Sequence, residues 1–172
     1  MSTSKPVSTL EIIPQGLASI LSANRLVVPK YQRAFSWEEE QVSSFLSDVN
    51  SAFSNGEIEY FMGTVVLQGT ESKYSVVDGQ QRLTTASLFI AAARDFLHKN
   101  SQEQVAKGLE HQFLQNSDIW TQQNNPKLTL STYDNDFYIK SILEGKKIYA
   151  SRESHRRLLI ARDRCLKFIT QL

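Results

Sequence analysis

The first clear pattern of apolar and polar positions along the chain has a helical period. Apolar side chains recur at intervals of three and four residues between positions 42 and 53 and predict an amphipathic helix: Val42, Phe45, Leu46, Val49 and Phe53. Ser36 and Glu39 precede this stripe with the spacing of a capping box, so we expect Ser36 to be the N-cap of this helix.

Short runs rich in β-forming residues follow this helical pattern. The runs "YFMGTVVLQ" (60–68) and "KYSVV" (73–77) flank the turn-like "GTES" and predict a hairpin. With the earlier run "RLVV" (25–28) it should form a small mixed sheet. A helical pattern follows from Gln80 or Gln81 to about Leu97 and is apolar nearly all round, which predicts a central helix. The expected fold class is α+β.

The pattern weakens after Asn100. Helices are predicted over 101–116, 135–145 and 153–172, with a short strand near 126–131. We therefore divide the chain into a core, residues 1–100, and a mostly helical extension of the same domain, residues 101–172. The last helix meets no stop signal, which suggests that the natural chain continues or that this helix meets a partner.

Composition adds few constraints. The 172 residues suffice for one domain with a core, and 19 Lys and Arg against 18 Asp and Glu leave no bulk charge for nucleic acid or membrane. A local basic patch and an oligomer remain open. One cysteine, no signal peptide and no apolar run of about 20 residues predict a soluble cytoplasmic protein without membrane partners.

Polar chemistry gathers where the second β run meets the central helix, in "SVVDGQQRLTT" (75–85). Backbone N–H groups and the dipole at a helix N-terminus favour anions such as phosphate. Gly79 permits close approach, Arg82 can grip a phosphate, and Thr84 and Thr85 add hydroxyls. Asp78 could hold Mg²⁺ or orient a water molecule. The alternative is structural: Asp78 is an N-cap and the next residues are a solvated first turn.

A second polar and aromatic cluster follows the first β run, in "VPKYQRAFSW" (28–37). Its aromatic residues could stack on a base, while Gln32 and Arg33 could bind the edge of the base or a phosphate: Tyr31, Phe35 and Trp37. The alternative is that the aromatic rings anchor a loop and Arg33 pairs with an acid. Because both clusters end strand-like runs, we expect Arg33, Arg82 and Asp78 to share one cleft.

Other candidate residues carry less chemistry. The three histidines have no metal-binding spacing and are expected at the surface: His98, His111 and His155. Cys165 lies on an apolar stripe and should be buried. The last helix is locally basic, with "SRESHRR" followed by Arg162, Arg164 and Lys167, and either forms a solvated face or contacts nucleic acid.

Together the two clusters resemble the N-terminal domain of the GmrSD family of modification-dependent restriction enzymes. The hallmark Asp-Gly-Gln-Gln-Arg is Asp78 to Arg82, and the Tyr-Gln-Arg and Trp elements are Tyr31 to Arg33 and Trp37. The resemblance covers about residues 20 to 100. A weaker element, "LTLSTYDNDFYIKSIL", offers Asp134 or Asp136 as its acid.

The resemblance implies a ParB/sulfiredoxin-like fold and a domain that binds and hydrolyses a nucleoside triphosphate to control a nuclease. The nuclease partner in this family carries an HNH-type signature, which this sequence lacks, so cleavage is expected in another domain or subunit. The implied catalytic residues are Asp78, Gln81 and Arg82, with Mg²⁺ on Asp78. The implied nucleotide-binding residues are Tyr31, Gln32, Arg33, Trp37, Gly79, Gln80, Thr84 and Thr85.

Two other functions remain open. The domain could be a non-catalytic module that binds DNA and senses its modification, using the same arginines on the phosphates. It could also be an interaction domain that has kept the fold and lost the site. The base preference of the nucleotide is not set by these residues.

Overall fold

The computed structural model describes residues 11–56, 61–70, 73–117 and 124–172. The first part of the chain forms α1 (Leu17–Ala23), β1 (Arg25–Val27), α2 (Glu39–Ser54), β2 (Val66–Thr70), β3 (Lys73–Asp78) and α3 (Gln80–Lys99). The second part forms α4 (Glu103–Leu109), the π-helical turn η1 (Glu110–Leu114), β4 (Gln115–Ser117), β5 (Asn124–Pro126), β6 (Leu128–Thr129), α5 (Asn135–Phe137), the π-helical turn η2 (Tyr138–Leu143) and α6 (Glu153–Ile169).

The main sheet is mixed, as the sequence predicts. Its strand order is β2-β3-β1-β6, in which β2 and β3 form an antiparallel hairpin and β1 runs parallel to both β3 and β6. β4 and β5 form a separate small hairpin. The α+β prediction is therefore confirmed. The first strand of the large hairpin is shorter than expected, because β2 begins at Val66 and residues 61–65 are not a strand; Tyr60 lies outside the described residues.

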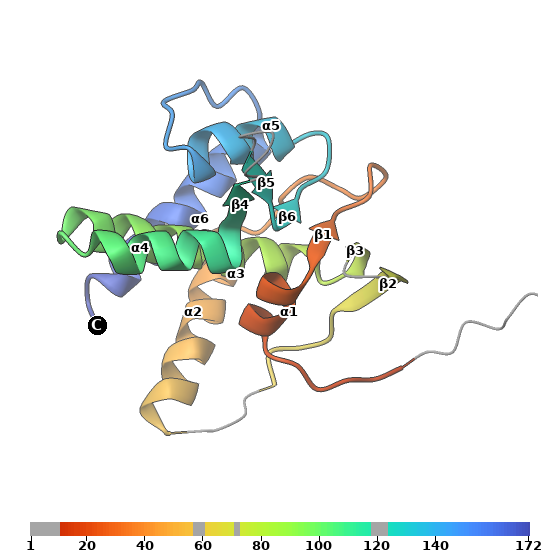
Figure 1. The fold of residues 1–172 in the computed structure, drawn as a ribbon, viewed down its shortest axis with the longest axis horizontal. Helices are drawn as coiled ribbons and strands as arrows, with labels where there is room; N and C mark the ends of the chain where they lie inside the picture. The colour runs from red at the N-terminus through yellow and green to blue at the C-terminus, as the bar shows by residue number, and fades with distance from the viewer. Residues whose placement is uncertain (1–10, 57–60, 71–72, 118–123) are drawn as a thin grey trace, which may run out of the picture.

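The core lies where α3 packs against α6, and it includes buried residues of the sheet such as Leu26 and Val76. Figure 1 places the main sheet to the right and α2, α4 and α6 to the left, and α3 runs from the sheet side leftward along α4 and α6. α3 is buried on several sides, including Leu83, Leu88, Ala91 and Ala92, which confirms the predicted central helix. Cys165 of α6 is fully buried, as expected. Among the described residues, no helix is both long and apolar enough to cross a membrane.

The start of α2 differs from the prediction. The N-cap is Glu38, not Ser36, and the capping box joins Glu38 to Gln41, whose Oε1 accepts the Glu38 N–H at 2.8 Å. Ser36 lies two residues before the N-cap, and its N–H binds a side chain of α3 (below). Farther along, the predicted helix over 101–116 gives way to the π-helical turn η1 and then, at Gln115, to β4.

A buried arginine in α3 was not expected from the apolar pattern around it. Arg94 is 3% exposed and donates hydrogen bonds to the Asp95 carboxylate and to the carbonyl oxygens of Ile142 and Leu143 at 2.8–3.0 Å. Asp95 also pairs with Arg162 of α6. This charged cluster joins α3, η2 and α6, and it satisfies carbonyl groups at the end of η2 that have no helical partner.

Candidate functional site

The two polar clusters of the sequence lie side by side. Residues 31–37, here called the junction loop, run along the end of β3 and the first turn of α3. Gln32 Nε2 donates to the Val77 carbonyl at 2.9 Å, and Gln80 Nε2 donates to the Arg33 carbonyl at 3.2 Å. In each bond a side chain of one segment donates to a backbone carbonyl of the other. The two clusters are therefore adjacent in the structure.

Gln81 fixes the junction loop to α3. Its Oε1 accepts the N–H groups of Ser36 and Trp37 at 2.8 and 3.3 Å, and its Nε2 donates to the Ala34 carbonyl at 3.3 Å. The residue is 8% exposed. A buried amide whose oxygen and nitrogen are both engaged by backbone groups acts here as a positioning residue.

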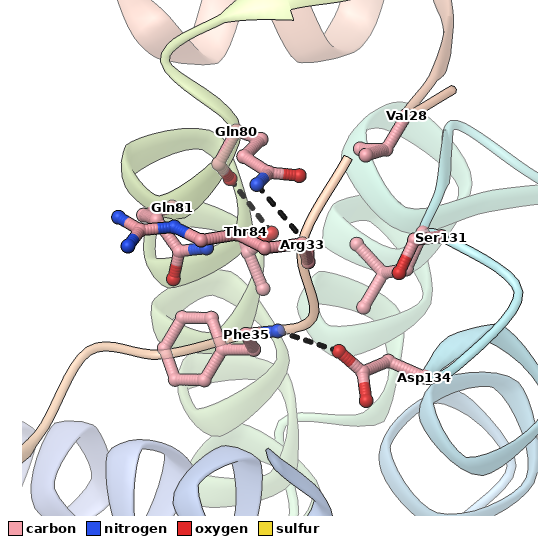
Figure 2. Close-up of a pocket in the computed structure, with 9 residues that line it drawn as sticks. Val28, Arg33, Phe35, Gln80, Gln81, Thr84, Ser131 and Asp134 are labelled. Atoms are coloured by element: carbon pink, nitrogen blue, oxygen red, sulfur yellow. Dashed lines mark hydrogen bonds between the residues drawn. The ribbon is translucent and has the colours of Figure 1, made fainter. Parts of the chain in front are cut away.

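Asp134 holds the other side of the loop. It is 1% exposed; its Oδ2 accepts the Phe35 N–H at 2.6 Å and its Oδ1 accepts the Ser154 hydroxyl at 2.5 Å. Figure 2 shows Asp134 facing Phe35, with Gln80 and Thr84 on the α3 side. Asp136, the other candidate acid, is exposed and pairs with Lys140. Of the two candidate acids, Asp134 is the one that contacts the junction loop.

His155 supports Asp134 from the first turn of α6. Its ring stacks on Phe137 at 4.2 Å between centroids, and its Nε2 lies 3.0 Å from the Tyr133 carbonyl and 3.9 Å from Asp134 Oδ1. Because a carbonyl oxygen can only accept, the proton is on Nε2. The expectation of a surface histidine is wrong at this position, since His155 is 7% exposed.

Gly79, not Asp78, is the N-cap of α3. Gly79 has a left-handed backbone (φ 87°), and no side chain caps the helix. A Cβ at this position would lie 2.9 Å from Val65 Cγ2, so glycine is required by both conformation and space. Asp78 is the exposed last residue of β3, and the capping alternative for it is wrong. An uncapped N-terminus leaves backbone N–H groups for a ligand or water.

Arg82 turns toward the segment before β2. Its Nη1 donates to the Thr64 carbonyl at 3.0 Å. Gly63 makes room for it, since a Cβ there would lie 2.7 Å from the Arg82 guanidinium carbon. The hydroxyls of Thr84 and Thr85 donate to the carbonyls of Gln80 and Gln81 at 2.8 and 2.9 Å, within their own helix.

A small junction pocket lies between α3, the junction loop and Asp134 (Figure 2). It is lined by Val28, Arg33, Phe35, Gln80, Gln81, Thr84, Leu130, Ser131 and Asp134 and has a volume of about 10 Å³, room for about one water molecule. Arg33 lines this pocket, whereas Asp78 and Arg82 do not. Of the three residues predicted to share one cleft, only Arg33 lines this pocket, and the shared cleft stays a prediction.

The aromatic residues of the junction loop divide into two groups. Phe35 is buried, and Trp37 is partly buried against Phe45 at 6.1 Å between ring centroids, so both anchor the loop to the core. Tyr31 is 79% exposed. Of these three rings, only that of Tyr31 could stack on a base while the loop stays packed on the core.

Of the two acids beside the junction loop and the start of α3, Asp78 and Asp134, Asp78 is the one that a cation could reach. Its carboxylate has no hydrogen bond or ion pair within the part of the chain that the structure describes, whereas both oxygens of Asp134 accept hydrogen bonds. The described residues contain no group of three or more His, Cys, Asp or Glu that could hold a metal. Mg²⁺ often binds through one or two carboxylates plus substrate phosphates, so Asp78 fits an ion that arrives with a nucleotide.

These observations define a class of protein, an α+β domain in which an uncapped helix N-terminus faces an arginine-bearing loop. Residues 17–168 match the family model described as the GmrSD restriction endonuclease N-terminal domain, and the chain belongs to this family. The resemblance seen in Asp78 to Arg82 is thereby confirmed. Comparison with curated proteins found no match.

Proposed function

We propose that this domain binds a nucleoside triphosphate at the N-terminus of α3 and hydrolyses it, and so controls a nuclease carried by another domain or subunit. The observation that carries the proposal is the uncapped N-terminus of α3 with the Arg33 side chain beside it. Arg33 is exposed, and its guanidinium has no hydrogen bond or ion pair with any described residue. Free N–H groups, a helix dipole and a free guanidinium together favour phosphate.

The geometry supports a division of roles within the motif. N–H groups near Gly79 and Gln80 would cradle the phosphates, and Arg33 would bind them from the loop. Asp78 would orient the attacking water or hold Mg²⁺, which when bound offsets charge on the phosphates. Gln81 would act by positioning the loop. Arg82 would reach a phosphate only by releasing the Thr64 carbonyl.

The size of the junction pocket limits where the nucleotide lies. A pocket of about 10 Å³ cannot admit a base, so the phosphates should lie on the open side of the α3 N-terminus, with the base toward Tyr31. The family membership also supports the proposal that the core is ParB/sulfiredoxin-like.

Phosphate release by the purified protein, with each nucleoside triphosphate and Mg²⁺, tests this function. Asp78→Asn should reduce hydrolysis by orders of magnitude, since asparagine is a poor base and a weak Mg²⁺ ligand. Folding should be unchanged, because Asp78 caps nothing. Asp163→Asn, the same change at an exposed site on α6, is the matched control. Wild-type hydrolysis by Asp78→Asn, or no hydrolysis by the unaltered protein, would contradict the proposal.

A further inference from the structure

A second hollow lies beside the junction loop. This hollow, here called the arginine cleft, is open and has a volume of about 420 Å³. It lies between the junction loop, Tyr133 and the first turn of α6, and its lining includes Arg33, Arg152 and Arg157. The volume is within the range of ligand-binding sites, unlike that of the junction pocket.

The lining of the arginine cleft carries a net positive charge. Its lining holds three arginines and a single exposed carboxylate, that of Glu153. Arg157 is partly neutralised, because it lies 3.1 Å from Glu38 and 3.9 Å from Glu153. Arg33 and Arg152 are exposed and have no ion pair with any described residue. Two arginines without an ion pair beside one hollow favour an anionic ligand.

The floor of the cleft is held in place by the buried contacts of Asp134. Ser154 lines the cleft, is 7% exposed and donates its hydroxyl to Asp134, which also binds the Phe35 N–H of the junction loop. No side chain caps α6, whose first residues line the cleft and whose N-cap is Arg152. The helix dipole therefore adds to the attraction for an anion.

An aromatic ring lies beside these charges. The ring of Tyr133 is 48% exposed, and the Arg152 guanidinium lies over it at 5.4 Å from the centroid. Cations that follow a backbone, together with an exposed ring, are the means by which proteins hold nucleic-acid strands.

We propose that the arginine cleft binds the phosphate backbone of a nucleic-acid strand, with Arg33 and Arg152 on the phosphates and Tyr133 against a base. This site is adjacent to the proposed nucleotide site at α3. The two share Arg33 and the junction loop, so a strand in the cleft would contact the same loop that faces the α3 N-terminus.

Charge reversal at a lining and a non-lining position of α6 tests the proposal. Arg152→Glu and the control Arg156→Glu change net charge equally, but Arg156 is exposed and does not line the cleft. Binding of labelled single-stranded DNA and of the corresponding duplex is followed by fluorescence anisotropy over a range of salt, without nucleotide. Arg152→Glu should weaken binding about tenfold and lower the magnitude of the salt slope by about 1, while Arg156→Glu should stay within about threefold.

Several outcomes would overturn the proposal. One is an equal loss of DNA affinity in the two variants, and another is no DNA binding by the unaltered protein. A third is that Arg152→Glu weakens the binding of free nucleoside triphosphate but not of DNA, which would make the cleft a nucleotide site. The neutral variant Arg152→Gln and a thermal melt exclude misfolding as the cause of a loss. Because DNA binding is measured without nucleotide, the result does not depend on whether the domain hydrolyses one.

Discussion

Two arginine side chains lie against opposite ends of α3 in opposite circumstances. Toward the C-terminal end, Arg94 is 3% exposed and donates to a carboxylate and two carbonyl groups. Near the N-terminal end, Arg33 is exposed, and its guanidinium has no partner among the described residues. A buried guanidinium must have partners because desolvation of an unpaired charge is costly, whereas an exposed one remains available to a ligand.

The same distinction divides the Asp-Gly-Gln-Gln-Arg motif. The side chains of Gln80, Gln81 and Arg82 bind backbone carbonyls or N–H groups of neighbouring segments, so they fix the geometry of the junction. The carboxylate of Asp78 and the uncapped helix end after Gly79 are not engaged in this way. One contiguous motif therefore combines residues that build the site with groups that can act in it.

The largest effect on stability is expected at Arg94. Arg94→Ala would leave the Ile142 and Leu143 carbonyls and part of the Asp95 charge without partners in the core, and should lower the free energy of unfolding by about 3 kcal/mol or more. Urea unfolding followed by circular dichroism measures this, with exposed Arg156→Ala as control. A loss below about 1 kcal/mol would show that this buried cluster does not hold α3 to η2 and α6.

A smaller loss is expected at Asp134, where the site is attached to the core. Asp134→Ala removes the acceptors of the Phe35 N–H and the Ser154 hydroxyl and should cost about 2 kcal/mol, with Asp134→Asn between it and the unaltered protein. Asp136→Ala, at an exposed ion pair, should stay within about 0.5 kcal/mol. Equal unfolding midpoints for Asp134→Ala and Asp136→Ala would contradict the assigned role.

A third effect should appear in alkali. Burial raises the pKa of the Cys165 thiol from 9.0 to about 12, and burial raises the pKa of Tyr138 from 10.0 to about 12. Above about pH 9 the unfolded chain loses protons that the folded chain keeps, so stability is complete below that pH and falls as the pH rises toward 12. The loss should be roughly 2 kcal/mol by about pH 10, as measured by urea unfolding, with the thiol contributing most of it.

The variant Cys165→Ala supplies the control for this pH dependence. The cavity left by the missing sulfur should lower the stability of this variant at all pH values. Its free energy of unfolding should nevertheless fall less steeply between about pH 9 and about pH 10, because the thiol no longer titrates. An unchanged slope would mean that the thiol does not contribute to the loss.

The sequence predicts the fold better than it predicts the contacts of the site. Regular spacing identifies α2, α3 and the hairpin of β2 and β3, since each buries one face or is buried throughout. It misplaces the start of α2, because the Ser36 N–H binds Gln81, a residue 45 positions away. It also misses Arg94, whose burial depends on carbonyls at the end of η2. Local patterns cannot reveal partners that only the tertiary structure supplies.

Within the site, residue type indicates chemistry but not orientation. Arg33 and Arg82 look equivalent in the sequence, yet Arg82 reaches Thr64 while Arg33 lines both the junction pocket and the arginine cleft. A signal for the position of Arg82 was present in Gly63, which leaves room for the guanidinium. The arginine cleft could be anticipated only in part, because the basic first turn of α6 is recognisable but its closeness to Arg33 is not.

The smallest effect on stability is expected at Arg33, the counterpart of Arg94. Arg33→Ala removes an exposed side chain with no partner among the described residues, so the free energy of unfolding should change by less than about 0.5 kcal/mol. Binding should change far more, since Arg33 lines both hollows: the affinity for nucleoside triphosphate should fall about tenfold or more. Calorimetric titration with nucleotide, beside urea unfolding of the same variant and of the exposed control Arg25→Ala, separates the two quantities. Two results would contradict the assignment of a structural role to Arg94 and a binding role to Arg33. One is that Arg33→Ala unfolds as easily as Arg94→Ala, and the other is that it binds nucleotide as tightly as the unaltered protein.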